Sequence, residues 1–287
     1  MISASVVADS ASASGRRITT LSLKYPRFIH SELMTHRLFS RNAASSRAIP
    51  VARMLADVTE EPALPIYWGK NQKGMAAEEE LNEEEKAKVL KTILLLRDVS
   101  VKMVESLNDI GLHKQTANRY LEPWQHMATV VTATEWANFK ALRINKKAQP
   151  EFKELAVQMQ EAMLKSNPRI LHAGEWHTPY VGDEERTRGD NHYAIKLSVA
   201  RCARVSYKSH ETGLVDVPAD LSRFDALLAS GHMSPFEHQA RPLEDPMEWS
   251  GNFRGFEQYR KMIPGEAIFD EGEGMTSARL HWSNTKL

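Results

Sequence analysis

Apolar and polar side chains alternate over residues 18–25, a pattern that predicts a β-strand with one buried side. Leu21, Leu23 and Tyr25 share one side of this strand, and the residues between them are polar. Residues 1–17, which precede the strand, are rich in Ser and Ala and contain no long apolar run. We therefore expect a frayed N-terminal segment and not a signal peptide; a poor transit sequence is the alternative.

Helical periodicity marks the middle of the chain. Residues 78–108 carry apolar side chains every three or four positions, acids crowd the first turn, and Gly111 follows the end. A second helix is predicted to begin at Pro150, and its apolar face consists of Phe152, Leu155, Ala156, Met159 and Met163. Shorter helices are predicted over residues 28–38, 190–203 and 220–230. Asp220 is the expected cap of the last helix, and Gly231 is expected to end it.

Two further segments favour strands. Residues 129–134 are rich in β-branched side chains, so a strand stays open there beside a helical alternative. Residues 236–241 alternate in the strand period. The predicted secondary structure is therefore mixed, with helices dominating the middle of the chain.

Composition narrows the class of protein. The 287 residues carry 37 Lys and Arg against 37 Asp and Glu, and this neutral balance argues against a protein that binds nucleic acid polymers along its length. Cys202 is the single cysteine, so no intramolecular disulfide can form; it is predicted to be a small core residue. No apolar stretch approaches the ~20 residues of a membrane span. Because a single cysteine suits a reducing compartment, we expect a cytoplasmic protein.

A polar segment over residues 35–47 has the composition of an anion site. Within thirteen residues it contains three arginines, several hydroxyls, an amide and an imidazole. Guanidinium groups and hydroxyls of this kind can surround a phosphate group. A solvated loop of Arg and Ser explains the composition equally well, so the residues alone leave both interpretations open.

A second polar segment, residues 231–238, places two histidines six positions apart. In a strand His232 and His238 would lie about 20 Å apart at ~3.3 Å per residue, which is too far for one metal ion. Pro235 breaks any helix that could bring them together. We therefore predict no metal site, and the polar side chains here fit the rim of a pocket better.

Together these segments resemble the flavin-dependent thymidylate synthases, the ThyX family. The family's signature is matched by Thr35-His36-Arg37, Ser40, Asn42, Ser45 and Arg47. Its other motifs are matched by Gly231–His238, by Arg201–Ser206, by Ala117, Arg119 and Pro123, and by Asn138, Phe139, Leu142, Arg143, Ala148, Gln149 and Glu151. In the ordinary family the motifs at 201–206 and 231–238 precede the signature, so this chain resembles a circular permutant with the old termini joined within residues 165–195.

The resemblance implies an α+β fold, a mixed β-sheet flanked by a helical layer, in one catalytic domain over residues 1–287. Residues 17–165 would hold the sheet entry, nucleotide loop and helical region, residues 190–263 the permuted flavin and folate segment, and residues 264–287 a tail. It also implies methylation of dUMP at C5, with FAD as cofactor, methylenetetrahydrofolate and NADPH as co-substrates, and a homotetramer whose sites are shared between subunits.

Site residues carry over from the family by position. Arg143 would be catalytic, stabilising negative charge on the uracil ring. The residues implied to bind dUMP are Ser40, Arg41, Ser45, Ser46, Arg47, Arg119 and Arg143. The residues implied to contact FAD are His36, Arg37, Asn138, Ser206, His232 and Ser234. Glu237 and His238 would order the strand that carries the last two.

The sequence departs from the family pattern in three places. Thr35 stands where the family has Arg, Ala43 where it has Glu, and Thr132 and Thr134 where it has Asn and Arg. These departures leave two rivals open: a related transfer of another one-carbon unit, such as hydroxymethylation of a pyrimidine deoxynucleotide, and a catalytically inactive nucleotide-binding homologue.

Overall fold

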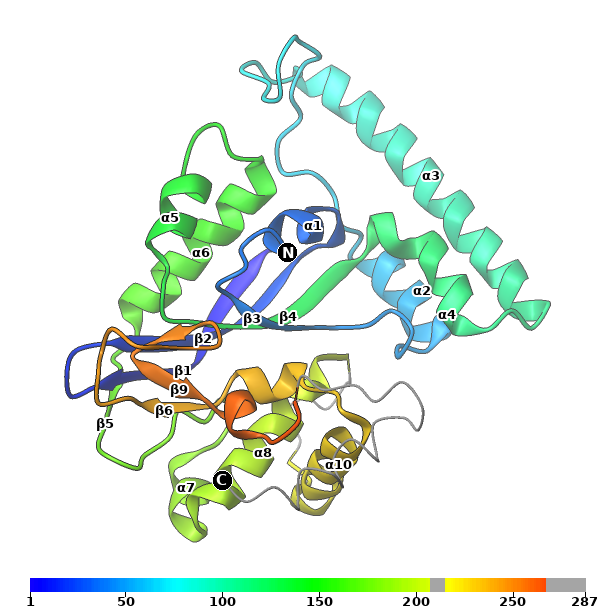
Figure 1. The fold of residues 1–287 in the computed structure, drawn as a ribbon. Helices are drawn as coiled ribbons and strands as arrows, with labels where there is room; N and C mark the ends of the chain where they lie inside the picture. The colour runs from blue at the N-terminus through cyan, green and yellow to red at the C-terminus, as the bar shows by residue number, and fades with distance from the viewer. Residues whose placement is uncertain (207–214, 267–287) are drawn as a thin grey trace.

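A computed structural model describes residues 1–206 and 215–266 and has a five-stranded mixed sheet at its centre (Figure 1). The strands lie in the order β3-β4-β2-β1-β5, and all neighbours are antiparallel except β1 and β5. Their bounds are β1 Ser3–Ser12, β2 Arg17–Pro26, β3 Ser40–Ala43, β4 His126–Ala133 and β5 Arg169–Leu171. The expected strand over 18–25 and the strand alternative for 129–134 are thus confirmed.

The start of the chain is the inner strand β1, so the expectation of a frayed segment was wrong. Strand β1 pairs with β2 from Ser3↔Lys24 to Ala11↔Arg17, with an irregularity between Val6 and Ala8, and pairs with β5 along its other edge. Short Ser and Ala side chains carry little strand propensity of their own. Hydrogen bonding to a strand on each side therefore orders this segment, and that pairing is invisible to local periodicity.

One face of the sheet is covered by helices α5 and α6 and by the short α1 (Figure 1). These elements are η1 Arg27–Ile29, α1 His30–Leu33, α5 Ala137–Arg143 and α6 Pro150–Lys165. Helix α6 buries the five predicted apolar residues, which confirms that face. The helix predicted over 28–38 is shorter than expected, because the chain turns after Leu33 and leads into β3.

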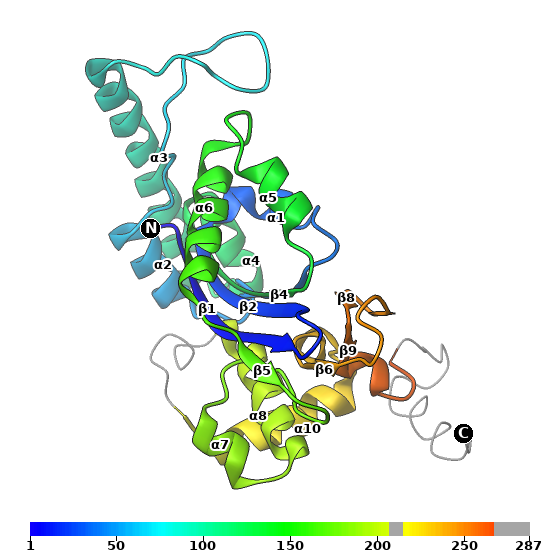
Figure 2. The same cartoon turned by 90° about the vertical axis from the view of Figure 1, so that its left-hand side faces the viewer.

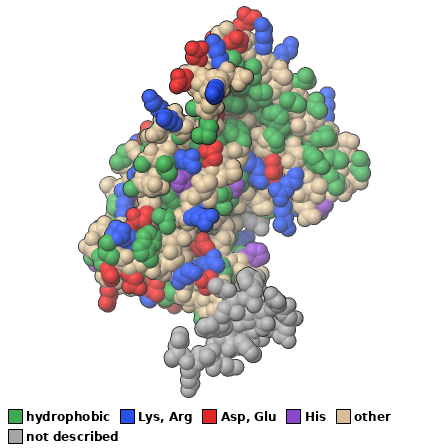
Figure 3. Space-filling model, turned by 45° about the horizontal axis from the view of Figure 1, so that its top comes forward, with side chains coloured by type: hydrophobic (Ala, Val, Ile, Leu, Met, Phe, Trp, Pro, Cys, Tyr) green, Lys and Arg blue, Asp and Glu red, His purple; other side chains and the backbone are tan. Residues whose placement is uncertain are grey.

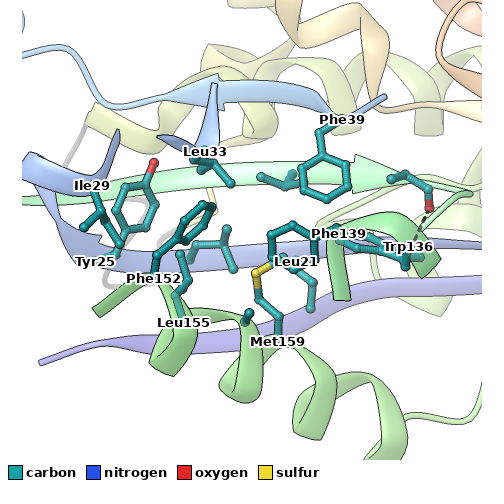
Figure 4. Packing of buried hydrophobic residues seen from close by; sticks show 14 of the residues in the cluster. Leu21, Tyr25, Ile29, Leu33, Phe39, Trp136, Phe139, Phe152, Leu155 and Met159 are labelled. Carbon is teal, nitrogen blue, oxygen red and sulfur yellow. Dashed lines mark hydrogen bonds between the residues drawn. The ribbon is translucent and has the colours of Figure 1, made fainter. Parts of the chain in front are cut away.

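The core under these helices is aromatic and aliphatic (Figure 4). Leu21 and Tyr25 of β2 face Phe139 of α5 and Phe152 and Leu155 of α6. Each of these side chains is at most 3% exposed. At about 25 cal/mol per Å² of apolar area removed from water, this burial is the main stabilising contribution on this face.

A second helical group lies at the side of the sheet and contains the long helix α3 (Figure 1). Its members are α2 Val51–Glu60, α3 Glu83–Asp109, α4 Lys114–Ala117 and η2 Asn118–Trp124. Helix α3 begins five residues later than its acidic run predicted, since Asn82 and Glu85 form a capping box there. Within the described part of the chain, α3 buries only Val104 fully.

The opposite face of the sheet carries the segment from residue 172 onward (Figure 2). Its elements are α7 Asp183–Arg188, α8 Asn191–Ala203, η3 Arg204–Ser206, α10 Val217–Ser230, η4 Ser234–Glu237, β6 Ala240–Pro242, β7 Trp249–Ser250, β8 Phe253–Arg254, β9 Phe256–Gln258 and η5 Tyr259–Met262. The predicted helix 190–203 is confirmed. The strand predicted over 236–241 is confirmed only at its end, where β6 begins at Ala240. Residues 236 and 237 belong instead to the 3-10 helix η4, because Pro235 favours the first turn of a helix.

Local details of this segment follow its sequence in part. Gly231 ends α10 in the left-handed conformation at φ 71°, as expected of a glycine after a helix. The N-cap of α10 is Asp216, not Asp220, which is fully buried among arginines. Cys202 is buried as predicted, and burial raises the pKa of its thiol, so it suits the core and not nucleophilic chemistry.

The architecture is therefore α+β, a mixed sheet flanked by helices, as predicted. In the described ranges 1–206 and 215–266, no helix has the length and apolar character that crossing a bilayer requires.

Candidate functional site

Arg143 lies at the end of α5 and is held by three side chains of the α1 region. Its Nε donates to His36 Nε2 at 2.9 Å, its guanidinium pairs with the Glu32 carboxylate at 3.1 Å, and it donates to Thr35 Oγ1 at 3.4 Å. The guanidinium also lies 4.4 Å from the ring centroid of Phe152. We call Glu32, Thr35, His36 and Arg143 the Arg143 cluster. The three partners hold the planar, positively charged guanidinium of Arg143 in one defined orientation.

His36 is neutral in this arrangement. Because its Nε2 accepts a hydrogen bond from Arg143, the ring proton must be on Nδ1. Burial, followed by the positive charges of Arg143 and Arg41, lowers the pKa of His36 to about 4. The ring packs edge-on against Phe139, with centroids 4.9 Å apart. His36 therefore positions Arg143 without adding a charge at neutral pH.

The departures from the family pattern have structural partners here. Thr35 accepts from Arg143, a contact that an arginine at position 35 could not make. Thr132 is fully buried and bonds to His238 Nδ1 at 2.8 Å. Thr134 accepts from the backbone N–H of Arg254 at 3.0 Å. Thr132 in β4 and Thr134 just after it therefore tie the sheet to the segment that follows residue 231.

The residues predicted to contact flavin fall on both sides of the edge strand β3. Arg37 and Asn138 are exposed and adjoin His36 and Phe139 along the chain. Ser234 donates to Asn42 Oδ1 at 3.1 Å, and the exposed His232 bonds to Ser230 at 2.9 Å. The side chain of Ser206 lies outside the described residues. The structure thus brings His36, Arg37, Asn138 and Arg143 to one region and places Ser234 across β3.

Ser40 and Arg41, predicted to bind nucleotide, have partners inside the protein. Ser40 is fully buried and accepts from Gln258 Nε2 at 3.0 Å. Arg41 donates to the carbonyls of Leu33, Met34 and His36 and thereby caps α1. These contacts give both side chains structural roles inside the protein.

The other residues predicted to bind the nucleotide lie near the loop after β3. Ser45 and Arg47 are exposed, whereas Ser46 is buried and donates to Glu122 Oε1 at 3.2 Å. Arg119 donates to the same oxygen at 2.8 Å. Arg27 pairs with it as well, at 2.9 Å. We call Arg27, Ser46, Arg119 and Glu122 the Glu122 cluster.

A buried amide holds this loop in place. Asn118 Nδ2 donates to the carbonyls of Ser46 at 2.8 Å and Ile49 at 2.9 Å, and Asn118 is fully buried. Sequence reasoning missed Arg27, Asn118, Glu122 and Glu32. Only the proximity of Glu122 to Arg119 on one helical turn could have been read from the sequence.

A cavity of about 580 Å³ opens beside this loop. It is bounded by Ser3 and Ser22 of the sheet, Met54 of α2, Trp124 and Tyr180. Within the described residues none of the predicted site residues lines it. Because its described lining lacks the predicted site residues, we place the candidate site at the two clusters and not in this cavity.

Two solved structures are similar in fold. A UMP/dUMP methylase PolB from Streptomyces cacaoi, bound with 5-Br UMP, is 19% identical, with a TM-score of 0.48 over 57% of this chain and 89% of that chain. The same protein bound with 5-Br dUMP is 18% identical, with a TM-score of 0.47 over 57% and 90%. No curated protein matches the sequence.

The sequence profile of a protein family matches residues 17–169. This range contains β2 to β4, the Arg143 cluster and the Glu122 cluster, and it spans more than half of the 287 residues. The family is described as thymidylate synthase complementing protein. The chain belongs to this family, which is the ThyX family that its motifs resemble.

Proposed function

We propose that the protein methylates C5 of the uracil ring of dUMP, using methylenetetrahydrofolate, FAD and NADPH. The observation that carries the proposal is that the family match includes Arg143, held by His36, Thr35 and Glu32 in one orientation. Adding a carbon at C5 requires negative charge on the ring, and a preorganised guanidinium stabilises such charge as it develops.

Arg143 would therefore act on the pyrimidine. Its planar fork can donate to the carbonyl edge of uracil, and the Phe152 ring beneath it limits its movement. Ser45, Ser46, Arg47 and Arg119 would bind the phosphate and sugar of dUMP. We assign Ser45 to binding, because a serine hydroxyl is by its own chemistry a poor nucleophile.

The donors near His36 fit the chemistry of a flavin nucleotide. Arg37 is a cation suited to the pyrophosphate, and Asn138 offers an amide for ring carbonyls, both on exposed positions. His36, Arg37, Asn138, Ser206, His232 and Ser234 would hold the cofactor. When bound, the reduced flavin would supply the hydride that converts the transferred carbon to a methyl group.

We further propose that the protein is a homo-oligomer, as the tetramers of its family imply. Helix α3 and its C-cap support this with exposed apolar residues at heptad spacing (Figure 3). These are Leu96, Val99 and Met103 in the helix and Ile110 at the C-cap, which are 43–78% exposed. Sedimentation equilibrium should give a multiple of the 32.5 kDa chain mass. A monomer at micromolar concentration would contradict this proposal.

The permuted order of motifs is also part of the proposal. The segment with residues 201–206 and 231–238 packs on the face of the sheet opposite α5 and α6. Asn42 of β3 donates to the Cys202 carbonyl at 2.6 Å and accepts from Ser234. These contacts support a site that combines the two segments whatever their order in the chain.

The test is the identity of the product. Purified protein with FAD is incubated with dUMP, labelled methylenetetrahydrofolate and NADPH, and the nucleotide is analysed by mass spectrometry. We expect labelled dTMP. Hydroxymethyl-dUMP instead would establish the related one-carbon transfer, and unchanged dUMP with retained nucleotide binding would indicate the inactive homologue.

Arg143→Lys sharpens the assignment of the catalytic group. Lysine keeps the charge and loses the planar fork, so we expect turnover to fall by about 100-fold or more, the magnitude typical of losing one preorganised donor. Flavin absorbance of the purified variant should be retained. Lys140→Arg, on the same helix, serves as the control and should leave turnover unchanged.

A further inference from the structure

We infer that the Glu122 carboxylate occupies the phosphate-binding donors of the nucleotide site in the free protein. A phosphate monoester displaces this carboxylate when it binds. The inference rests on the proposed function, because it concerns the same substrate site. It assigns Arg27 to that site as a further phosphate ligand and assigns Glu122 a regulatory role in binding.

Three donors converge on a single oxygen of Glu122. Arg119 at 2.8 Å, Arg27 at 2.9 Å and Ser46 at 3.2 Å all contact Oε1. Guanidinium groups and a hydroxyl arranged around one anionic oxygen are also the donors that bind phosphate. A phosphate monoester would offer three oxygens and about two negative charges to the same donors.

The donors come from three separate parts of the chain that the fold holds together. Ser46 is in the loop after β3, Arg119 is in η2, and Arg27 begins η1. Asn118 fastens the loop to η2 from a fully buried position. The donors are therefore preorganised, and binding an anion there costs little rearrangement beyond moving Glu122.

The charge around the loop favours an added anion. Arg27 and Arg119 together outweigh the single Glu122 carboxylate, and Arg47 is exposed on the same loop. Lys114 Nζ lies 3.2 Å from the Ala48 carbonyl, which brings a further cation to the loop. The Glu122 carboxylate carries one negative charge and a phosphate monoester about two. The monoester therefore displaces the carboxylate from the donors, whereas anions with a single charge compete poorly.

Binding measurements on the full chain test this inference. Isothermal titration of wild type and Glu122→Gln with dUMP, deoxyuridine and inorganic phosphate separates the phosphate contribution from the base. Because glutamine keeps the shape and loses the charge, we expect Glu122→Gln to bind dUMP and inorganic phosphate about tenfold more tightly, with deoxyuridine unchanged. Glu105→Gln, on an exposed position of α3, should equal wild type.

A second variant tests the donor side. Arg27→Gln should weaken dUMP binding about tenfold and leave deoxyuridine unchanged. Equal or weaker phosphate binding by Glu122→Gln would overturn the inference, since Glu122 would then only support the donors. Tighter binding of inorganic phosphate without any binding of dUMP would keep the anion site and reject the proposed substrate.

Discussion

The two faces of the central sheet are built in different ways. On the face under α5 and α6, Leu21, Leu23 and Tyr25 pack against phenylalanine rings, and stability comes mainly from apolar burial. On the opposite face, a continuous chain of hydrogen bonds crosses the strands. Its members, joined at 2.7–2.9 Å, are Ser10, His177, Thr20, Thr132 and His238 in that order.

The difference lies in what each face tolerates. An apolar face loses stability in proportion to the volume removed, and it is indifferent to pH. The polar face requires both imidazoles to be neutral and each hydroxyl to be present, because an unpaired buried polar group is costly. His177 and His238 are fully buried, and burial lowers the pKa of each to about 3.

The largest effect is expected on the apolar face. Phe152→Ala should lower the free energy of unfolding by about 3–5 kcal/mol, because the ring is fully buried among Phe139, His36 and Arg143. Urea denaturation measures the loss. Phe28→Ala is the matched control, since Phe28 is 40% exposed and its loss should cost much less. Similar losses in both variants would contradict the assignment of the core to this face.

Acidification should weaken the polar face next. A histidine whose pKa is lowered by folding binds protons first in the unfolded state, so its stability contribution is complete above pH ~6.5 and falls as the pH approaches ~3. At pH 5 the free energy of unfolding should be lower than at pH 7 by about 2 kcal/mol for each of His177 and His238. Denaturation midpoints at a series of pH values give the slope.

His238→Gln isolates one of the two histidines. Glutamine can still bond to Thr132 and does not titrate in this range, so the pH slope between 7 and 5 should be shallower than in wild type. An unchanged slope would show that His238 is not the group that responds.

The smallest effect concerns a single hydroxyl. Thr132→Val keeps the side-chain shape and removes two hydrogen bonds, one to Thr20 and one to Nδ1 of His238. In the described part of the protein, the other ring nitrogen of His238, Nε2, has no partner that could compensate. We expect a loss of about 1–3 kcal/mol in the free energy of unfolding. Thr116→Val, on an exposed position of α4, should change it little. A loss exceeding that of Phe152→Ala would reverse the comparison between the faces.

Sequence patterns were most informative where buried positions recur at a regular spacing along one helix or strand, or where the local backbone geometry calls for a particular residue. The buried face of α6, the strand β2, the glycine after α10 and the burial of Cys202 were all predictable, because each depends on periodicity or on local backbone geometry. Strand β1 was missed, because its alternation of Ile2, Ala4 and Val6 with serines is short and built largely of small side chains, and its order comes from pairing with β2 and β5.

The candidate site divides in the same way. Motifs identified Arg143, His36, Ser46 and Arg119 as candidates, but the chain alone could not show that Glu32 and Glu122 hold them. Ser46 and Glu122 are 76 residues apart, and Arg143 and Glu32 are 111 apart. Contacts over such separations depend on how the sheet and helices pack.

By itself, then, the sequence determined the periodic elements, the neutral overall charge and the family to which the chain belongs. Tertiary structure alone decided that the first residues form an inner strand of the sheet. It also decided which hydroxyls link the two buried histidines and which carboxylate pairs with the predicted phosphate donors. The physical reason is that periodicity reports only whether a side chain is buried. Its partner is set by packing, where hydrogen bonds and charges are satisfied by residues distant along the chain.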